Sequence, residues 1–423
     1  MNHDDLHDLL TRATDAIESP GLATGVLPIV RKRRKRRRGA LAAAGATAAV
    51  AVVLVGVTVT GEGKPQPAPK PPTTVSTPTP APDPARGAVK PRWDPFTIVD
   101  APLRDSVLPQ HLEPPASAPT VTDQAMEAAV LAWPLEGRDL LLLGTDGEWR
   151  SAPGTADAVA EALSGGLPAL SPDGHQVAMS TISGIRVVDV TDTGTLRSGL
   201  QRTIPWPAQI SENWDIPPGL LWLPDGQGWI VQHWQGTWVV EPDGEAYRPP
   251  FGGTYQNMSG LAVDDDNTLV ERRWYEHDFD KRDLRVWRDG EVESRVEFHY
   301  WGDNDLATQD GLLAMVGGAD YLPGDGGPMV FDAATGQLLA YLPITDPNAY
   351  YTDGGYLDAL GFLDPDTVLL HVTPVDIHSS DNRNTTSHLA AWHLDSGDFE
   401  RLTSGDIRMR SIVVAPDVLD GTE

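Results

Sequence analysis

The sequence predicts an all-β fold, a six-bladed β-propeller closed by its C-terminal strand. First, a unit of one short strand and a Pro/Asp/Gly-type turn recurs six times after residue 166, at spacings of 52, 40, 45, 55 and 52 residues. Repeats of this length are typical of propellers and solenoids. Second, the apolar runs are short, rich in Val and bounded by Gly or Pro, as strands are. Third, the two ends of the repeat region hold complementary fragments of one unit, which favours a ring.

Each of the five complete units is predicted to contain four strands. A second strand follows the turn, and Gln176–Thr181 and Thr367–Thr373 are clear examples. The third strand runs into an Asp/Gly hairpin turn such as Asp289-Gly290, because these tight turns need a positive φ. A fourth, outer strand completes the unit. Within this region only residues 155–163 predict a short helix.

The two incomplete fragments are predicted to form the sixth blade together. Residues 128–133, 139–144 and 148–152 match strands two to four, and residues 411–415 match strand one. Joining them removes the open sheet edges of a linear array. We expect Ile412 and Val414 to face one neighbouring blade and Val413 the other, and residues 419–423 to be dispensable. The alternative is a seven-bladed ring with a further strand at residues 96–100.

One turn carries a family resemblance. Residues 170–179 read Leu-Ser-Pro-Asp-Gly-His-Gln-Val-Ala-Met, which resembles the repeat of TolB-like and WD40-like propellers. The resemblance covers residues 120–417, but two of the turns lack its glycine. It implies a fold, and such propellers serve as scaffolds, sensors and enzymes alike.

Four segments are predicted along the chain. Residues 1–38 form a cytoplasmic tail with a short amphipathic helix over 2–18 and eight basic residues at 31–38. Residues 39–60 carry no charge and are long enough for a transmembrane helix. Residues 61–92 form a Pro-rich linker, with ten prolines within 62–92. Residues 93–423 form the propeller domain, with a strap at 93–120 and blades at 121–417.

This layout predicts a single-pass membrane protein. The basic run before the apolar segment keeps the N-terminus in the cytoplasm and places the propeller outside the cell. A cleaved export signal is the alternative to a retained anchor. The layout resembles that of membrane-anchored propeller proteins of high-GC bacteria.

Charge and composition exclude several classes. The formal net charge is −28, and the part after residue 60 is the acidic part. So acidic a domain repels nucleic acid, and we expect no nucleic-acid partner. The chain has no cysteine, which excludes disulfides, thiolate metal sites and a lipoprotein anchor.

No catalytic motif of the nucleophile-elbow, His-Glu-x-x-His or phosphate-loop kind occurs. No cofactor is expected, and calcium is the ion that acidic turns would suit. The weak metal candidates are Asp303, Asp305 and Asp310. Other acidic groups are Asp264 to Asp266 and the set Asp278, Asp280 and Asp283. His388 and His393 are five residues apart on one strand, so they should face opposite sides and share no zinc.

Six tryptophans fall within residues 206–238. Trp222, Trp229 and Trp238 lie in predicted strands and are expected in the core. Trp206 and Trp214 lie in a Pro-rich connection between blades, and they are the candidate ligand-binding residues because exposed tryptophans stack on sugars or clamp peptides.

The predicted function is a membrane-anchored, extracytoplasmic binding or sensing module that is not an enzyme. Its ligand would be an extracytoplasmic protein, a peptide or a glycan, and residues 2–18 could bind a cytosolic partner. The alternative is a metal-dependent hydrolase or lactonase with a carboxylate site near the propeller axis.

Overall fold

The computed structural model separates the chain into two units, Met1–Thr77 and Pro78–Glu423. It describes residues 78–419 except 192–200, 208–209, 211–216, 224–225, 234–235, 253–258, 265–267, 276–277, 303–305, 320, 324–325, 346–355, 375–385 and 407–410. Among the described residues, no helix has the length and apolar character needed to cross a membrane. The predicted transmembrane segment 39–60, the amphipathic helix and most of the Pro-rich linker lie outside the described residues.

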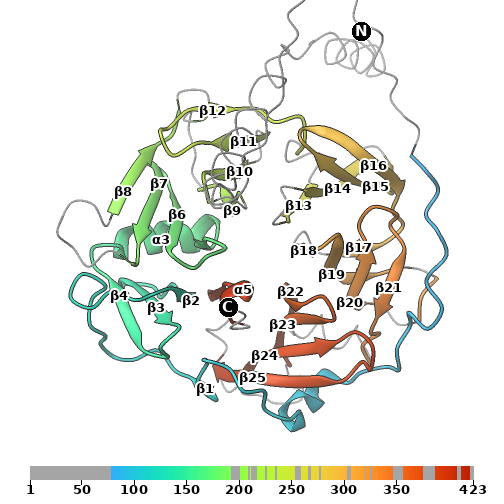
Figure 1. The fold of residues 1–423 in the computed structure, drawn as a ribbon, viewed down its shortest axis with the longest axis horizontal. Coiled ribbons are helices and arrows are strands. Elements are labelled where there is room, and N and C mark those ends of the chain that lie inside the picture. The colour runs from blue at the N-terminus through green and yellow to red at the C-terminus, as the bar shows by residue number, and fades with distance from the viewer. Residues whose placement is uncertain are drawn as a thin grey trace, which may run out of the picture. The chain divides into compact units, whose positions relative to one another are not determined.

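Six sheets surround a common axis and form the blades of a β-propeller (Figure 1). Blade 1 contains β26 (Val413–Val414), β2 (Ala129–Trp133), β3 (Leu140–Gly144) and β4 (Trp149–Ala152). Blade 2 contains β5 (Ala169–Leu170), β6 (Gln176–Thr181), β7 (Gly184–Asp189) and β8 (Gln201–Pro205). Blade 3 contains β9 (Gly219–Trp222), β10 (Trp229–His233), β11 (Gly236–Val240) and β12 (Ala246–Tyr247).

The other three blades follow around the ring. Blade 4 contains β13 (Ser259–Val263), β14 (Leu269–Tyr275), β15 (Asp278–Arg288) and β16 (Glu291–Glu297). Blade 5 contains β17 (Trp301–Gly302), β18 (Ala307–Gln309), β19 (Leu312–Gly318), β20 (Gly327–Asp332) and β21 (Leu338–Tyr341). Blade 6 contains β22 (Tyr356–Asp364), β23 (Thr367–Thr373), β24 (Thr386–His393), β25 (Phe399–Asp406) and β1 (His111–Leu112).

The ring closes as the sequence predicts, within blade 1. Strand β26 from the end of the chain pairs antiparallel with β2, with Val413 opposite Ala132. Val413 packs on the core between blades 1 and 2, whereas Ile412 and Val414 pack on the core between blades 6 and 1. The expected alternation of faces is therefore confirmed.

Two expectations about closure are wrong. Residues 96–100 do not add a seventh blade, because Pro95–Asp100 forms the 3-10 helix η2 with Asp94 capping it through a bond from the Phe96 N–H. Leu419 is not dispensable either. It ends the short helix α5 (Pro416–Leu419) and is buried in the core between blades 6 and 1.

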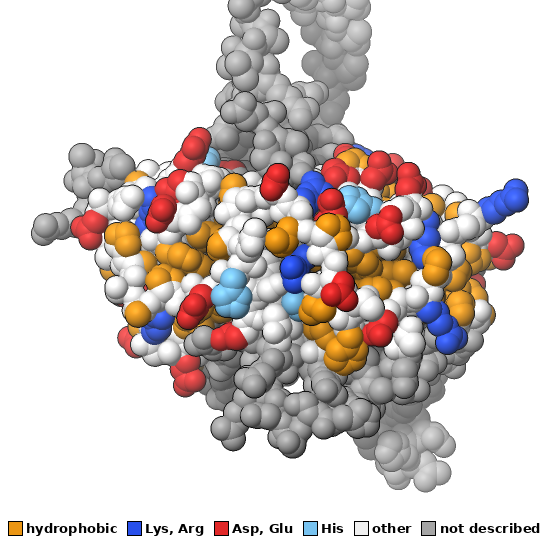
Figure 2. Space-filling view, turned by 90° about the horizontal axis from the view of Figure 1, so that it is seen from below, with side chains coloured by type: hydrophobic (Ala, Val, Ile, Leu, Met, Phe, Trp, Pro, Cys, Tyr) orange, Lys and Arg blue, Asp and Glu red, His pale blue; other side chains and the backbone are white. Residues whose placement is uncertain are grey.

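Residues 78–121 form a belt along the outer wall of the ring. The belt adds parallel pairings to the outer strands of blades 4, 5, 6 and 1 in turn: Thr79 with Val296, Val89 with Tyr341, Trp93 with Ile344, Leu103 with Arg401, β1 with β25, and Thr120 with Ser151. Belt pairings occur at Thr79 and Val89 too, within the segment that the sequence indicates as a linker. Figure 1 shows it in blue to cyan at the right and bottom of the ring, and Figure 2 shows hydrophobic side chains among charges of both signs on that lower wall.

Each of the six contacts between neighbouring blades has its own hydrophobic cluster in the described part of the ring. Belt residues join four of these clusters: Ala88 between blades 4 and 5, Trp93 and Ile98 between blades 5 and 6, Leu108 and Leu112 between blades 6 and 1, and Val121 between blades 1 and 2. The core of this propeller is thus a circle of apolar interfaces between sheets.

Candidate functional site

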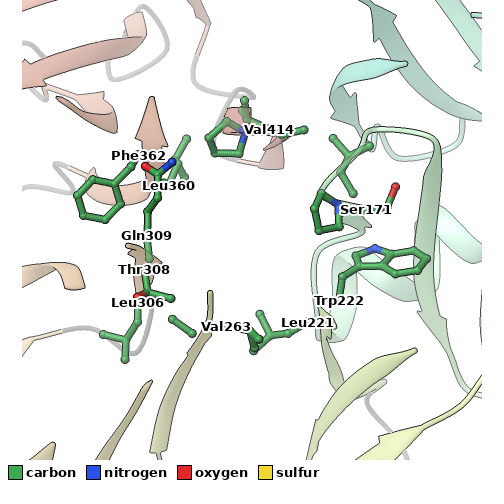
Figure 3. Close-up of a pocket in the computed structure, with 17 residues that line it drawn as sticks. Ser171, Leu221, Trp222, Val263, Leu306, Thr308, Gln309, Leu360, Phe362 and Val414 are labelled. Atoms are coloured by element: carbon green, nitrogen blue, oxygen red, sulfur yellow. The ribbon is translucent and has the colours of Figure 1, made fainter. Parts of the chain in front are cut away.

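The inner strands of all six blades surround a channel on the ring axis, with a volume of about 240 Å³ (Figure 3). It is lined by residues of the inner strands and of the segments directly beside them: Leu170, Ser171, Pro172, Leu221, Trp222, Ala262, Val263, Leu306, Ala307, Thr308, Gln309, Leu360, Gly361, Phe362, Val414, Ala415 and Pro416. Each blade contributes its inner strand to the channel wall, because only the inner strand of a blade lies next to the axis.

Every blade has at least one partly exposed side chain on the channel wall. The partly exposed lining residues are Pro172, Leu221, Val263, Leu306, Thr308, Gln309, Leu360, Val414 and Pro416. All except Thr308 and Gln309 are hydrocarbon side chains. The channel therefore presents an apolar collar toward its axis, a surface that favours neutral, apolar groups over ions.

The polar side chains of the channel are few and mostly occupied. The Ser171 hydroxyl donates to Asp173 at 2.6 Å, and the Thr308 hydroxyl donates to the Leu312 carbonyl at 2.7 Å. The side-chain oxygen of Gln309 has no hydrogen-bond partner among the described residues. Of the described lining residues, none is Asp, Glu, His, Lys or Arg. A carboxylate metal site at the axis, as the hydrolase alternative requires, therefore has no ligand among them.

The two candidate tryptophans are placed differently. Trp206 is only 7% exposed, its indole N–H donates to the Thr181 carbonyl at 2.8 Å, and its ring belongs to the cluster between blades 2 and 3. In this position the ring offers little surface to a ligand. Trp214 lies outside the described residues.

The three tryptophans expected in the core are buried there, as predicted. Trp222, Trp229 and Trp238 all belong to the cluster between blades 2 and 3. The Trp222 indole N–H donates to the Ala169 carbonyl of the neighbouring blade at 2.8 Å, and its ring lies 5.0 Å from that of Trp229. Large flat side chains thus fill the gap between these two blades.

The predicted metal candidates are not brought together in the described residues. Asp303 and Asp305 lie outside them, and Asp310 is exposed in the β18–β19 hairpin with a φ of 50°. Asp264 is buried and accepts a hydrogen bond from the Gly311 N–H at 3.1 Å. Asp283 is buried and bound by arginines.

The two histidines of β24 make separate contacts. His388 is buried, with Nδ1 2.9 Å from the Ser404 hydroxyl, whereas Nε2 of His393 lies 3.1 Å from Glu400. Burial lowers the pKa of His388 to about 4, and the nearby Arg401 adds to the shift. His388 is therefore neutral at physiological pH.

One acidic group was missed from the sequence. Glu241, Asp243 and Glu245 lie on the β11–β12 hairpin, and each offers a carboxylate oxygen within 4.8 Å of the others. The spacing Glu-x-Asp-x-Glu is the sequence pattern from which this acidic group could have been predicted. Two of the three are exposed, and exposed acidic groups of this kind are common without a bound ion.

No protein-family model matches the sequence, and no curated protein is similar to it. Among solved structures, a putative TolB from Agrobacterium tumefaciens is similar at 14% identity and a TM-score of 0.38, over 56% of this chain and 80% of that one. The β-propeller domain of the Trilobed protease from Pyrococcus furiosus is similar at 11% identity and a TM-score of 0.37, over 66% and 83%. Virginiamycin B lyase from Staphylococcus aureus is similar at 14% identity and a TM-score of 0.36, over 63% and 77%.

All three TM-scores lie below 0.5, so no argument rests on these likenesses. The chain is a six-bladed β-propeller protein, as its own sheet topology shows.

Proposed function

We propose that this protein is a non-catalytic binding module, held at the outer side of a cell membrane, whose ligand enters the axial channel. The observation that carries the proposal is the channel wall. All six blades converge on it, and its described lining is apolar and free of ionisable side chains. Such a site can recognise a ligand by shape and apolar contact, and its described lining offers no ionisable side chain to act as an acid or a base.

The size of the channel limits what can bind. The volume of the channel is about 240 Å³. This accommodates a small neutral molecule, or one apolar side chain or chain end of a larger partner such as a peptide or an extracytoplasmic protein. The unpartnered Gln309 oxygen supplies a hydrogen-bond acceptor at the edge of this apolar surface.

Membrane attachment rests on the sequence. Eight consecutive basic residues at 31–38 precede 22 uncharged residues at 39–60, and this order favours a cytoplasmic N-terminus with the propeller outside. Protease added to intact cells should digest the propeller and spare residues 1–38. A propeller that is digested only after lysis would contradict this topology.

The channel is tested by filling it. The full-length protein is screened by ligand-observed NMR against neutral fragments small enough for about 240 Å³. Val263→Phe places a larger side chain on the channel wall, and Val292→Phe makes the same change at an exposed position of β16 as a matched control. We expect fragments that bind the wild type and Val292→Phe but not Val263→Phe. No binding at all, or equal binding to both variants, would refute the channel as the site.

A further inference from the structure

The six contacts between neighbouring blades are unequal. Between blades 3 and 4 the described buried cluster has five members: Ile230, Val239, Leu261, Leu269 and Trp287. Between blades 2 and 3 it has thirteen, and between blades 5 and 6 it has seventeen. We call the contact between blades 3 and 4 the 3–4 seam. Among the described residues, this seam therefore has the smallest apolar cluster of the six, and apolar burial is the main force that holds packed sheets together.

The belt does not reinforce the 3–4 seam. Its pairings run from blade 4 through blades 5 and 6 to blade 1. The belt therefore crosses the contacts between blades 4 and 5, between blades 5 and 6, and between blades 6 and 1. Within the described residues, no belt pairing joins blade 3 to blade 4. The 3–4 seam therefore lacks the outer support that half of the ring possesses.

A buried carboxylate of blade 4 binds the connection that leads from blade 3 at this seam. Glu271 of β14 is 0% exposed. Its Oε1 accepts from the backbone N–H of Gly252 at 3.1 Å, and its Oε2 accepts from the indole N–H of Trp287 at 2.9 Å. Gly252 precedes blade 4 on the connection from blade 3 and has a φ of 77°. A side chain there would meet the Thr237 hydroxyl oxygen at 2.2 Å. The close approach of Gly252 to Thr237 places the Gly252 N–H within hydrogen-bond distance of Glu271.

Further charges lie next to Glu271. Arg285 Nη1 is 4.0 Å from Glu271 Oε2, and Arg285 also binds Asp283 at 2.9 Å. Arg295 pairs with the same Asp283 oxygen. Charged groups that are buried have lost their hydration, which they regain when the surface opens to water.

We propose that the ring opens locally at the 3–4 seam, with Glu271 as the latch that holds it shut. Leu221 and Val263 pack on the seam cluster and also line the channel. Opening here exposes the channel from the side, between β9 and β13. The idea that the ligand enters through this opening rests on the proposed function. The opening itself is independent of that function.

The lack of cysteine makes the opening directly measurable. Three buried valines are each replaced by the single cysteine of the full-length chain. They are Val239→Cys at the 3–4 seam, Val187→Cys between blades 2 and 3, and Val330→Cys between blades 5 and 6, which are 3%, 2% and 0% exposed. Thiol labelling is followed under native conditions without ligand, and each rate is corrected for the variant's global stability.

We expect the cysteine at 239 to react at least about tenfold faster than the other two, because only it becomes accessible by local opening. Equal corrected rates, or faster labelling at 187 or 330, would overturn the proposal. Adding Glu271→Gln should raise the labelling rate at 239 but not at 330, whereas Glu293→Gln, at an exposed position, should change neither. If Glu271→Gln does not fold, the labelling rates of the three single-cysteine variants still test the proposal. Since no ligand is used, failure of channel binding leaves this result unaffected.

Discussion

Val414 lies directly opposite Leu131 in blade 1, so the last strand of the chain is paired with the first strand of the blades. The residue after it, Ala415, donates its backbone N–H to Val130 at 3.0 Å. The two ends of the propeller therefore belong to one sheet.

Removing this pairing should open the ring. Deleting residues 410–423 exposes the blade faces that Ile412, Val413 and Leu419 now cover, and we expect a loss of about 5 kcal/mol or more, comparable to the whole stability of many domains. Deleting residues 420–423 should leave the melting temperature unchanged, because Leu419 is retained. Thermal unfolding of both truncations tests this. Equal melting temperatures for the longer truncation and the wild type would show that closure contributes nothing.

Gly361 is a tight contact point between blade 6 and the C-terminal segment. A Cβ atom there would lie 2.3 Å from Cγ of Pro416. Gly361→Ala should therefore cost about 1–3 kcal/mol through overpacking. Gly219→Ala is the matched control, since its Cβ would meet nothing closer than 3.9 Å. Urea unfolding should show a clear loss for the first variant and a small effect for the second, and equal effects would contradict the packing.

Asp146 binds the buried Arg150 across the β3–β4 hairpin through two hydrogen bonds, at 2.8 and 2.6 Å. The bond to Arg150 holds the pKa of Asp146 below its ordinary value of 3.8. Asp146→Asn should cost about 1–2 kcal/mol at pH 7, a figure reduced because Asp146 is half exposed. A carboxyl pKa that is lower in the folded state stabilises above the unfolded pKa and ceases to do so as the pH falls. The difference between wild type and variant should therefore shrink below pH 4, and a difference independent of pH would contradict the ion pair.

His388 predicts a second pH effect. Its pKa falls from 6.5 to about 4 because burial disfavours the imidazolium. As the pH falls below 6.5, His388 becomes protonated in the unfolded chain but stays neutral in the folded protein. The free energy of unfolding therefore declines until about pH 4. The loss is of the order of 3 kcal/mol, at 1.36 kcal/mol per unit. In His388→Asn this part of the decline should be absent. Parallel stability curves for both proteins between pH 7 and 4 would contradict the assignment.

The belt should contribute to stability through Trp93. This side chain is 9% exposed and stacks on Phe399 of blade 6 with ring centroids 4.3 Å apart. Trp93→Ala should cost about 3–5 kcal/mol, the usual range for a buried aromatic. Phe96→Ala, three residues away on the same belt and 44% exposed, should cost far less. Similar losses for the two variants would mean that the belt is not packed as described.

Local signals in the sequence were sufficient for the blades. Strands β6 and β23 have the predicted bounds, and the Asp289-Gly290 turn has the positive φ values of 57° and 82° that its residues indicate. The predicted helix at 155–163 is α3 (Ala156–Gly165). Strand β15 begins at Asp278, and charged residues in its first half conceal the strand pattern in the sequence.

Features that depend on contacts between residues far apart in the chain could not be predicted from the sequence. Residues 78–92 are rich in proline and indicate a linker, yet their strand character comes from outer strands hundreds of residues later, such as Val296 and Tyr341. The channel wall was likewise hidden, because Leu221 and Val263 are ordinary strand residues until six blades meet at one axis. Trp206 looked available in a Pro-rich connection, but the Thr181 carbonyl and the neighbouring tryptophans bury it.

The belt also divides the circumference into a covered and an open part. Blades 4, 5, 6 and 1 have their outermost backbone groups engaged, whereas within the described residues β8 and β12 of blades 2 and 3 do not meet the belt. β12 has only two residues, and β8 carries an exposed arginine and an exposed proline, Arg202 and Pro205, which discourage strand addition. These features oppose the addition of a strand from another chain at the two blades that the belt does not reach in the described part of the ring.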